Sequence, residues 1–515
     1  MNLKIQKFIS RYWILLILIA IKMILQYILV NPVYELHRDE FLYLNQGDHL
    51  AFGYISVPPL MALISKIVYL LGGSQFWIRF FPGLFGALTI VFVWLIIESI
   101  GGSLFSNIVA STALLFSALI RINILYQPNS FDILTWTIIF YLLIRFVQSE
   151  NPKWLYYLAA IIALSFYNKY NVLFLIAGLS IGLVATYQRK IFTNPSFWKA
   201  LIISLIILAP NIIWQVRNHF PVFQHMKVLK ANQLDNNTIS DFLKSQLLFF
   251  FGALPLTIGA LIAFCYYKSF RPFRFVGITF VSVITLFALM KAKDYYAVGI
   301  YPVVLAFGSV YIDNILSKRW KIFVLPALII FNFTVFISTL KVVYPIYTPP
   351  EIRKNAKAFE RLGMLRWEDG KNHNLPQDFA DMLGWKEIAD KTMSAYNIIP
   401  ASETENTLII CSNYGQAGAI NYYNRSKIPE AYAFNTDYIY WLPHLNKIQN
   451  LVYVGKKPSD EVIKMFKEYK QIGVVENEYA REKDTGIYIL TGASEMFTQV
   501  FYNKVEERKK NLDIF

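Results

Sequence analysis

The sequence predicts a polytopic α-helical membrane protein with about eleven spans, followed by a soluble α/β domain. Of its 515 residues, 56% are hydrophobic and only 16% are charged, whereas a soluble domain carries about 25% charged residues. The difference comes from long apolar runs that stop near Tyr344. Since a helix needs about 20 apolar residues to cross a bilayer, we expect a transmembrane domain over residues 1–345 and an extracytoplasmic α/β domain over residues 349–515.

The first apolar run has a basic start and no small-residue cleavage site after it, so it predicts a retained span rather than a signal peptide. An external loop over residues 31–76 follows. Within it, segments 39–51 and 59–71 are too short or too polar to cross, and they predict helices lying at the membrane interface. The predicted spans are 12–30, 77–98, 104–121, 130–147, 154–168, 170–187, 199–216, 242–267, 273–290, 295–314 and 322–344.

The charges predict the orientation of these spans. With the N-terminus inside, the cytoplasmic loops carry many basic residues and almost no acid, as the positive-inside rule requires. These residues are Lys4, Lys7, Arg11, Arg145, Lys153, Arg189, Lys190, Lys199, Lys268, Arg271, Arg274, Lys318, Arg319 and Lys321. The net charge of +15 then reflects cytoplasmic retention and contacts to anionic lipid, and nucleic acid is not expected as a partner.

The opposite side of the membrane holds most of the acids, amides and histidines of the membrane half, together with basic residues that the rule would exclude. Charged groups at this depth are costly, so such exceptions indicate function. The segments are 31–75, QPNSFD (127–132), NKYN (168–171), 214–241 and KAKDYY (291–296). We therefore predict a site built at this face from segments far apart in the sequence.

Asp39 and Glu40 form an acidic pair shortly after the first span. A carboxylate held there would accept a proton from an incoming hydroxyl, as a general base. The alternative interpretation is the first turn of an interfacial helix, because acids favour helix N-termini. The pair would also fit one divalent ion, but a metal is not favoured, and no cofactor is expected.

Three lysines stand near the same face. Lys291 and Lys293 are placed to hold a lipid-linked phosphate at headgroup level, unless they only extend toward the interface as helix-end lysines do. Lys169 lies between two apolar runs and is flanked by amides. Arg217 and His219 are interpreted as substrate-facing loop residues, since nothing near them completes a zinc site.

The order of these motifs resembles bacterial glycosyltransferase family 39, the relatives of protein O-mannosyltransferases and lipid A aminoarabinose transferases. The matching motifs are DEFLYL, GYISVPPL, QPNSFDILTW, YNKYNVLF, APNIIWQVRNHFPVF and KAKDYYAVGIYP, with DMLGWKEIAD, SNYGQAGAINYYN and YIYW in the C-terminal half. The resemblance implies a GT-C fold in the bacterial inner membrane. It also implies a polyprenyl-phosphate sugar donor and inversion at the anomeric carbon.

The resemblance also implies roles for single residues. Asp39 corresponds to the presumed base, and Glu40 would assist it or orient the acceptor. Lys293 is a candidate for the donor phosphate, and Lys169 matches a position of the NKY type. Val57 stands where the aminoarabinose transferases have a lysine before the proline pair, so the phosphate is held differently or the donor differs. The remaining predicted substrate-binding residues are Tyr54, Pro58, Gln127, Asp132, Arg217, His219, Tyr295 and Tyr296.

The predicted function is an integral membrane glycosyltransferase whose extracytoplasmic acceptor is lipid A, a glycan or a protein hydroxyl. The lipid phosphate is itself the leaving group, so no nucleotide-binding loop is needed, and the sequence contains neither a Walker A nor a GxGxxG motif. The alternative is a transporter or flippase of a lipid-linked sugar. A transporter should show an internal repeat and polar residues near mid-membrane, whereas these motifs stand at span ends.

The C-terminal half predicts strands at 407–413, 450–456 and 486–492 that alternate with helices, which favours a small, mostly parallel sheet. GQAG (415–418) lacks the spacing of a phosphate loop and indicates ordinary strand-to-helix packing. Asn413 and Tyr414 follow the first strand, at the end where open α/β sheets bind ligands. A role in acceptor recognition is the corresponding hypothesis.

Overall fold

The computed structural model describes residues 3–511, which form two compact units. The helical unit comprises Met1–Val30, Phe76–Ile213 and Leu234–Ile346, and the mixed unit comprises Asn31–Gln75, Trp214–Gln233 and Tyr347–Phe515. The last change of unit falls between Ile346 and Tyr347, and the division into a transmembrane and an extracytoplasmic domain stays a prediction. The external loop after the first helix belongs to the mixed unit, so it is packed with the C-terminal part of the chain.

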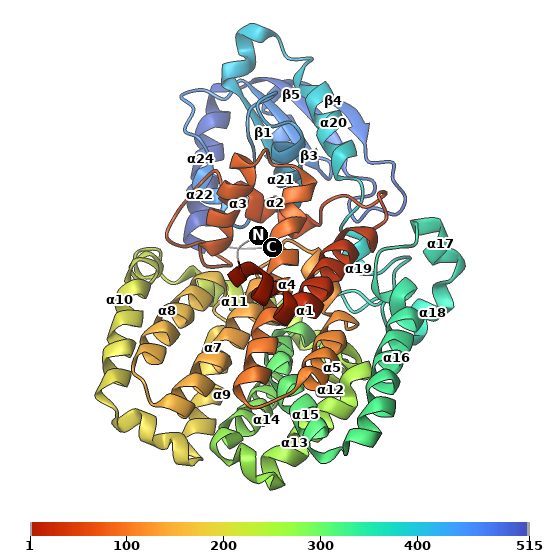
Figure 1. Ribbon diagram of the computed structural model, residues 1–515. Coiled ribbons are helices and arrows are strands. Elements are labelled where there is room, and N and C mark those ends of the chain that lie inside the picture. Colours follow the sequence, from red (N-terminus) through yellow and green to blue (C-terminus); the bar gives the residue numbers. More distant parts are fainter. Residues whose placement is uncertain (1–2, 512–515) are drawn as a thin grey trace. The chain divides into compact units, whose positions relative to one another are not determined.

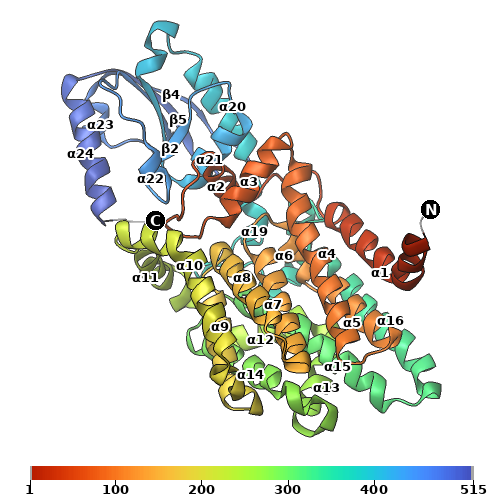
Figure 2. The same ribbon diagram turned by 60° about the vertical axis from the view of Figure 1, so that its left-hand side comes forward.

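The helical unit is a bundle of long apolar helices (Figures 1 and 2). They are α1 (Leu3–Ile28), α4 (Gln75–Ser99), α5 (Leu104–Leu115), α6 (Leu119–Ile124), α7 (Asn129–Ser149), α8 (Lys153–Asn168), α9 (Val172–Val184), α10 (Pro195–Arg217), α12 (Ile239–Phe249), α13 (Leu254–Tyr266), α14 (Arg274–Leu289), α15 (Tyr301–Ile315) and α16 (Lys318–Val343). Outer helices such as α10 and α16 expose large apolar side chains, among them Ile206, Ile322 and Ile330. An exposed apolar surface this wide is the surface of a membrane protein.

Every predicted span is largely helical, but the structure gives fewer candidate spans than the eleven that we expected. Among the described residues, seven helices are long and apolar enough to cross a membrane, or nine if each of two bent pairs forms one span. The difference lies in α5, which ends at Leu115, and in α8, whose 16 residues extend only about 24 Å. The multi-pass class is confirmed, with seven to nine candidate spans.

The loops that we assigned to one side of the membrane meet at one end of the bundle. Gln188 donates to the carbonyl of Pro272, Lys190 pairs with Glu150, and Lys321 pairs with Asp313. Each contact joins two different predicted cytoplasmic loops or a loop to an adjoining helix end. The contacts therefore support the assignment of these loops to the same end of the helical unit. Which end is cytoplasmic is a prediction from the charges.

The mixed unit contains a five-stranded sheet with the order β2-β1-β3-β5-β4. The strands are β1 (Thr407–Cys411), β2 (Ala431–Ala433), β3 (Asn450–Gly455), β4 (Phe466–Val474) and β5 (Gly486–Ala493). β1 pairs in parallel with β2 and β3, whereas β5 is antiparallel to β3 and β4. The expectation of a mostly parallel sheet was wrong, because no helix separates β4 from β5 and the chain returns directly.

Helices cover both faces of this sheet (Figure 2). The helices of the unit are α2 (Arg38–Gln46), α3 (Leu60–Leu70), α11 (Pro221–Asn232), α17 (Pro349–Lys354), α18 (Ala356–Arg361), α19 (Gln377–Ala380), α20 (Trp385–Tyr396), α21 (Tyr414–Tyr423), α22 (Tyr438–Trp441), α23 (Asp460–Ile463) and α24 (Glu495–Asn511). Phe497 and Phe501 of α24 share a core with β1, β3 and β5. On the other face, α20 and α21 cover the sheet, and α2 packs against α21.

Replacing Gly308 by alanine is expected to destabilise the helical unit. The new Cβ would overlap the main-chain carbonyl oxygen of Leu256 in α13 and lie 2.6 Å from its carbonyl carbon. Main-chain atoms cannot turn aside as a flexible side chain can, so we expect a loss of about 1–3 kcal/mol, measured as a lower unfolding temperature in detergent. Gly259→Ala on α13 is the control, because its Cβ would meet nothing closer than 3.5 Å. Equal unfolding temperatures for the two variants would contradict this packing.

Candidate functional site

Helix α2 begins with a capping box that holds the acidic pair in place. The His37 main-chain N–H donates to Oε2 of Glu40 at 2.6 Å, and the Asp39 N–H donates to Nδ1 of His37 at 3.2 Å. Glu40 is fully buried. This geometry gives Glu40 the helix-capping role that was the alternative interpretation of the acidic pair, so its side chain positions α2.

Asp39 is half-buried and points toward α21. Its Oδ1 accepts a hydrogen bond of 2.7 Å from the hydroxyl of Tyr414. The guanidinium of Arg38 lies over the same phenol ring, 4.3 Å from its centre. Burial raises the pKa of Tyr414 far above its ordinary value, and the neighbouring Asp39 carboxylate raises it further. The phenol therefore stays protonated and acts as the donor.

The glycines of the GQAG segment allow α2 to approach α21 this closely. A Cβ at Gly415 would lie 2.7 Å from Cγ of Arg38, and a Cβ at Gly418 would lie 2.7 Å from Cβ of Phe41. Phe41 is fully buried and contacts the ring of Trp385 edge-on at 5.7 Å. The sequence predicted strand-to-helix packing for GQAG, whereas the structure places Gly415 and Gly418 against α2, the helix that carries Asp39.

Further polar contacts fix the rest of the external loop to the C-terminal segment. Glu35 accepts from the main-chain N–H groups of Gly384 and Lys386 at the N-terminus of α20, where the helix dipole favours a carboxylate. Asp48 receives two hydrogen bonds of 2.6 and 2.7 Å from the guanidinium of Arg425. These anchors make the loop part of the folded mixed unit and limit its freedom to move apart from it.

Tyr54 and Pro58 are both buried in this loop. The Tyr54 hydroxyl contacts the main chain at Gln46, His49 and Ala51, at 3.0 to 3.1 Å. This arrangement closes the turn before α3. The substrate-binding role predicted for Tyr54 and Pro58 stays a prediction, and the observed role of Tyr54 is to hold the turn.

Three polar motifs converge in the helical unit around Lys169. Its ammonium donates to Oδ1 of Asn129 at 2.8 Å and lies 4.2 Å from the ring centre of Tyr296 and 5.2 Å from that of Tyr295. Asn129 in turn donates to Gln127 at 2.9 Å. The QPNSFD, NKYN and KAKDYY segments thus form one cluster, which we call the Lys169 cluster, as the sequence predicted for these motifs.

Asp132 and Asn171 complete this cluster. The Asn171 amide donates to Oδ2 of Asp132 at 2.8 Å and to the carbonyl of Tyr296 at 3.0 Å. Asp132 is buried and interacts electrostatically with Lys169, as does Lys293. The Lys169 ammonium therefore has one carboxylate and a second ammonium group near it, which gives the cluster a net positive charge suited to an anion.

The other predicted basic residues are not gathered into the Lys169 cluster. Lys291 is exposed, with a left-handed backbone at φ +49°, and its carbonyl accepts from Asn237 at 3.2 Å. Arg217 ends α10 and His219 follows it at φ +59°, and both are exposed. All three side chains are exposed, and their substrate roles stay predictions.

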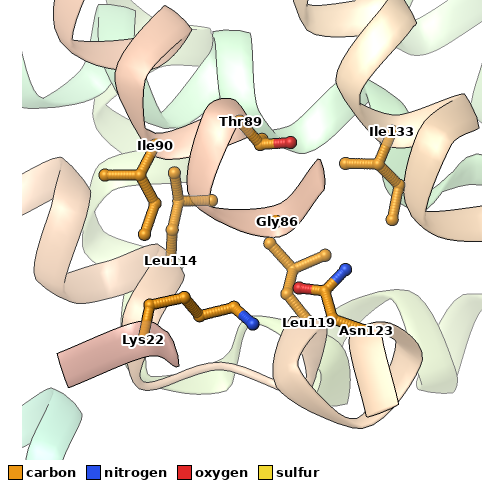
Figure 3. A pocket seen from close by; sticks show the side chains of 8 residues that line it. All are labelled: Lys22, Gly86, Thr89, Ile90, Leu114, Leu119, Asn123 and Ile133. Carbon is orange, nitrogen blue, oxygen red and sulfur yellow. The ribbon is translucent and has the colours of Figure 1, made fainter. Parts of the chain in front are cut away.

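Lys22 is a buried cation that sequence reasoning passed over. It is 2% exposed in α1, and its ammonium donates to Oε1 of Gln26 at 2.9 Å. Figure 3 shows its side chain extending past Gly86 toward Asn123, at the wall of a small cavity lined mainly by apolar side chains. A single lysine inside the run IAIKMIL was the available signal, because an ionisable residue within a span is rarely accidental.

The described part of the chain, residues 3–511, contains no group of three or more His, Cys, Asp or Glu side chains arranged to hold a metal ion.

Two features of the site could not have been found from the sequence. Tyr414 is separated from Asp39 by 375 positions, and no periodicity links them. Arg38 directly precedes the DEFLYL motif, but its contact with the Tyr414 ring depends on the packing of α2.

Comparison with known proteins agrees with this arrangement. Residues 56–214 match the family model of dolichyl-phosphate-mannose-protein mannosyltransferases. Two crystal structures of ArnT from Cupriavidus metallidurans, one bound to undecaprenyl phosphate and one in the apo state, share the fold at a TM-score of 0.59. Their sequence identities are 13% and 12%, over 93% of this chain and 98% of each ArnT chain. No curated protein sequence matches this chain significantly.

These findings define the class: the chain is a multi-pass membrane protein with a GT-C fold. The resemblance to glycosyltransferase family 39 is confirmed by the family match, which includes the SVPPL part of GYISVPPL and all of the QPNSFD and NKYN motifs. Within that class, the fold along nearly the whole chain is similar to that of ArnT.

Asp437 anchors the GYISVPP turn, and its protonation makes the stability of the protein depend on pH. It is 1% exposed and accepts from the Ile55 N–H at 2.7 Å and from Nε2 of Gln46 at 2.8 Å. Burial raises the pKa of Asp437 to about 6, although the two hydrogen bonds lower it. Because the folded-state pKa lies above the ordinary value, the stability linked to the neutral form is present at low pH and is lost as the pH rises through about 6.

Asp437→Asn is expected to remove this pH dependence. Asparagine is neutral at every pH, and its amide can donate to Oε1 of Gln46, which lacks a hydrogen-bond partner among the described residues, once the Gln46 amide rotates. A rise in pKa from 3.8 to about 6 corresponds to roughly 3 kcal/mol. Relative to the natural protein, the variant should therefore gain unfolding temperature as the pH rises from about 4 to about 6, and it should keep that gain at higher pH. Parallel melting profiles would contradict this.

Proposed function

We propose that this protein is a glycosyltransferase that moves a sugar from a polyprenyl-phosphate donor to a hydroxyl-bearing acceptor outside the cytoplasm, with inversion at the anomeric carbon. The observation that carries the proposal is the convergence of three motifs around Lys169. A half-buried lysine held by an amide, with a second lysine near it, is a site for an anion, and a lipid phosphate is the anion that reaches this depth of a membrane.

The Lys169 cluster is assigned to the donor. As the bond between the anomeric carbon and the phosphate oxygen breaks, negative charge develops on the leaving polyprenyl phosphate. Preorganised cations stabilise such charge strongly in a water-poor site. Asn129 and the face of Tyr296 hold the Lys169 ammonium in place, and Lys293 adds a second positive charge.

Asp39 is assigned to the acceptor. The acceptor oxygen forms the new bond to the anomeric carbon, and its proton passes to the Asp39 carboxylate as general base. Glu40 holds the first turn of α2 and so supports Asp39 indirectly. Attack from the face opposite to the leaving phosphate gives the inverted anomer.

The bound undecaprenyl phosphate in one ArnT structure supports a polyprenyl-phosphate donor for this chain as well. Val57 occupies the position before Pro58 and Pro59 where the resemblance would place a lysine, so the proposal does not specify aminoarabinose. The donor is a polyprenyl-phosphate hexose or pentose, and the acceptor is lipid A, a glycan or a protein hydroxyl. The positive-inside pattern supports a cytoplasmic N-terminus and an extracytoplasmic C-terminal domain.

A second candidate function is transport of a lipid-linked sugar. The observation that favours it is Lys22, which is buried inside α1 beside Gln26 and Asn123, because polar side chains within the spans are typical of transport pathways. The two functions differ in chemistry. A transporter leaves the bond between sugar and phosphate intact, whereas a transferase breaks it.

Asp39→Asn is expected to lower turnover by about 10²- to 10⁴-fold, the usual contribution of a general base, while binding of the lipid donor is retained. The amide keeps the shape of the side chain and can still accept from Tyr414. Turnover is measured as the polyprenyl phosphate released from labelled donor by purified protein in lipid. Asp390→Asn, an exposed carboxylate of α20 paired with Lys386, is the control. Full activity of Asp39→Asn would remove Asp39 from the base role.

Lys169→Gln is expected to weaken binding of polyprenyl phosphate by about tenfold or more, because it removes a charge-assisted contact to the phosphate. Binding is measured with labelled polyprenyl phosphate and the full-length protein in detergent. Lys153→Gln is the matched control, since Lys153 starts the helix that Lys169 follows and lies over Trp154 at the predicted cytoplasmic end. Equal affinities for the two variants would exclude Lys169 from the phosphate site.

A further inference from the structure

We propose that Tyr414 is a positioning residue for the general base, so that the C-terminal part of the chain supplies a working component of the catalytic site. This inference rests on the base role of Asp39 under the proposed function. Its geometrical basis is the 2.7 Å hydrogen bond from the Tyr414 hydroxyl to Oδ1 of Asp39. Neither the family match, which covers residues 56–214, nor the quoted motifs assign this role.

Tyr414 is held rigidly, as positioning requires. It is the first residue of α21, directly after the N-cap residue Asn413, whose side chain accepts from the N–H groups of Gly415 and Gln416. Asn413 itself is fixed by a hydrogen bond of 3.1 Å to Glu482. The phenol is 8% exposed and has little room to turn. The carboxylate of Asp39 is therefore oriented by the Tyr414 phenol, whose position is fixed where the chain passes from β1 into α21.

The same hydrogen bond favours the form of Asp39 that a base needs. A donor to a carboxylate stabilises the ionised form over the protonated one. Arg38 lies over the Tyr414 ring, and a cation over an aromatic face is an attractive contact that keeps the ring against α2. Tyr414 thus fixes the direction of the carboxylate and also keeps it ionised at lower pH.

The surroundings contain other charged groups that contribute to the titration of Asp39. Asp381 is 3% exposed and receives hydrogen bonds of 3.0 and 3.1 Å from Arg481. Its Oδ2 lies 3.7 Å from Nε2 of His37. The charged groups near the Asp39–Tyr414 pair are His37, Arg38 and Glu40 on α2, Asp378 and Asp381 before α20, and Arg481 and Glu482 before β5. A test must therefore change only the phenol hydroxyl.

Tyr414→Phe makes that change, and infrared difference spectroscopy reads it without any substrate. The carboxyl band of Asp39 is identified by its loss in Asp39→Asn, and its intensity is followed against pH in the full-length protein in detergent. We expect the pH at the midpoint of this titration to rise by about one unit in Tyr414→Phe, since one hydrogen bond to the charged form of Asp39 is lost. The acidic limb of the activity profile should rise by the same amount, so the loss of turnover is larger at low pH than at high pH.

Tyr423→Phe is the matched control. Tyr423 ends the same helix, and its hydroxyl donates to Oε2 of Glu35 at 3.3 Å, so this variant also loses a phenol contact to a carboxylate on the external loop. It should leave the Asp39 midpoint unchanged. Tyr414→3-fluorotyrosine keeps the hydroxyl but makes it a stronger donor, and it should move the midpoint downward even if the phenylalanine variant is poorly folded.

The outcomes separate this inference from the proposed function. An unchanged midpoint in both Tyr414 variants, or an equal shift in Tyr423→Phe, would overturn the positioning role. A midpoint that moves while the activity profile stays in place would instead show that Asp39 is not the base, and the proposed assignment would fail first. Support requires that the midpoint and the acidic limb move together in the Tyr414 variants. Both must stay unchanged in Tyr423→Phe.

Discussion

The close packing of α2 against α21 is the constraint on which the position of Asp39, the proposed general base, depends. Gly415 and Gly418 leave no side chain between the two helices, so Arg38 and Phe41 fit against α21 and Asp39 meets the hydroxyl of Tyr414. Through this packing, the external loop and the C-terminal sheet form one folded unit that presents the acid.

The Lys169 cluster depends on a different principle. There, amides and aromatic rings from three interhelical segments surround two ammonium groups and one carboxylate. Burying like charges is costly unless polar groups compensate them, and an anionic ligand would lower that cost. The polyprenyl-phosphate donor of the proposal matches this arrangement in charge and in its membrane location, while the Asp39 carboxylate matches a hydroxyl acceptor.

Hydropathy and charge patterning predicted the multi-pass class, the interhelical motifs of the Lys169 cluster and three of the five strands. The span count was too high because runs of apolar residues do not show where a helix stops, as at Leu115 in α5. β4 was missed because its sequence FKEYKQ reads as exposed, which is how an edge strand protects itself. Tyr414 as partner of Asp39 was beyond sequence reasoning, because a contact across 375 positions depends on tertiary packing alone.

The central claim is that the protein breaks the bond between a sugar and a lipid phosphate. The most direct measurement uses polyprenyl-phosphate sugars carrying one label in the phosphate and another in the sugar, given to purified protein in lipid vesicles with an envelope acceptor fraction. The account predicts that the two labels separate in equal amounts, with the phosphate label on free polyprenyl phosphate and the sugar label on the acceptor. Labels that stay together on one lipid while it changes leaflet would contradict the account and identify a transporter.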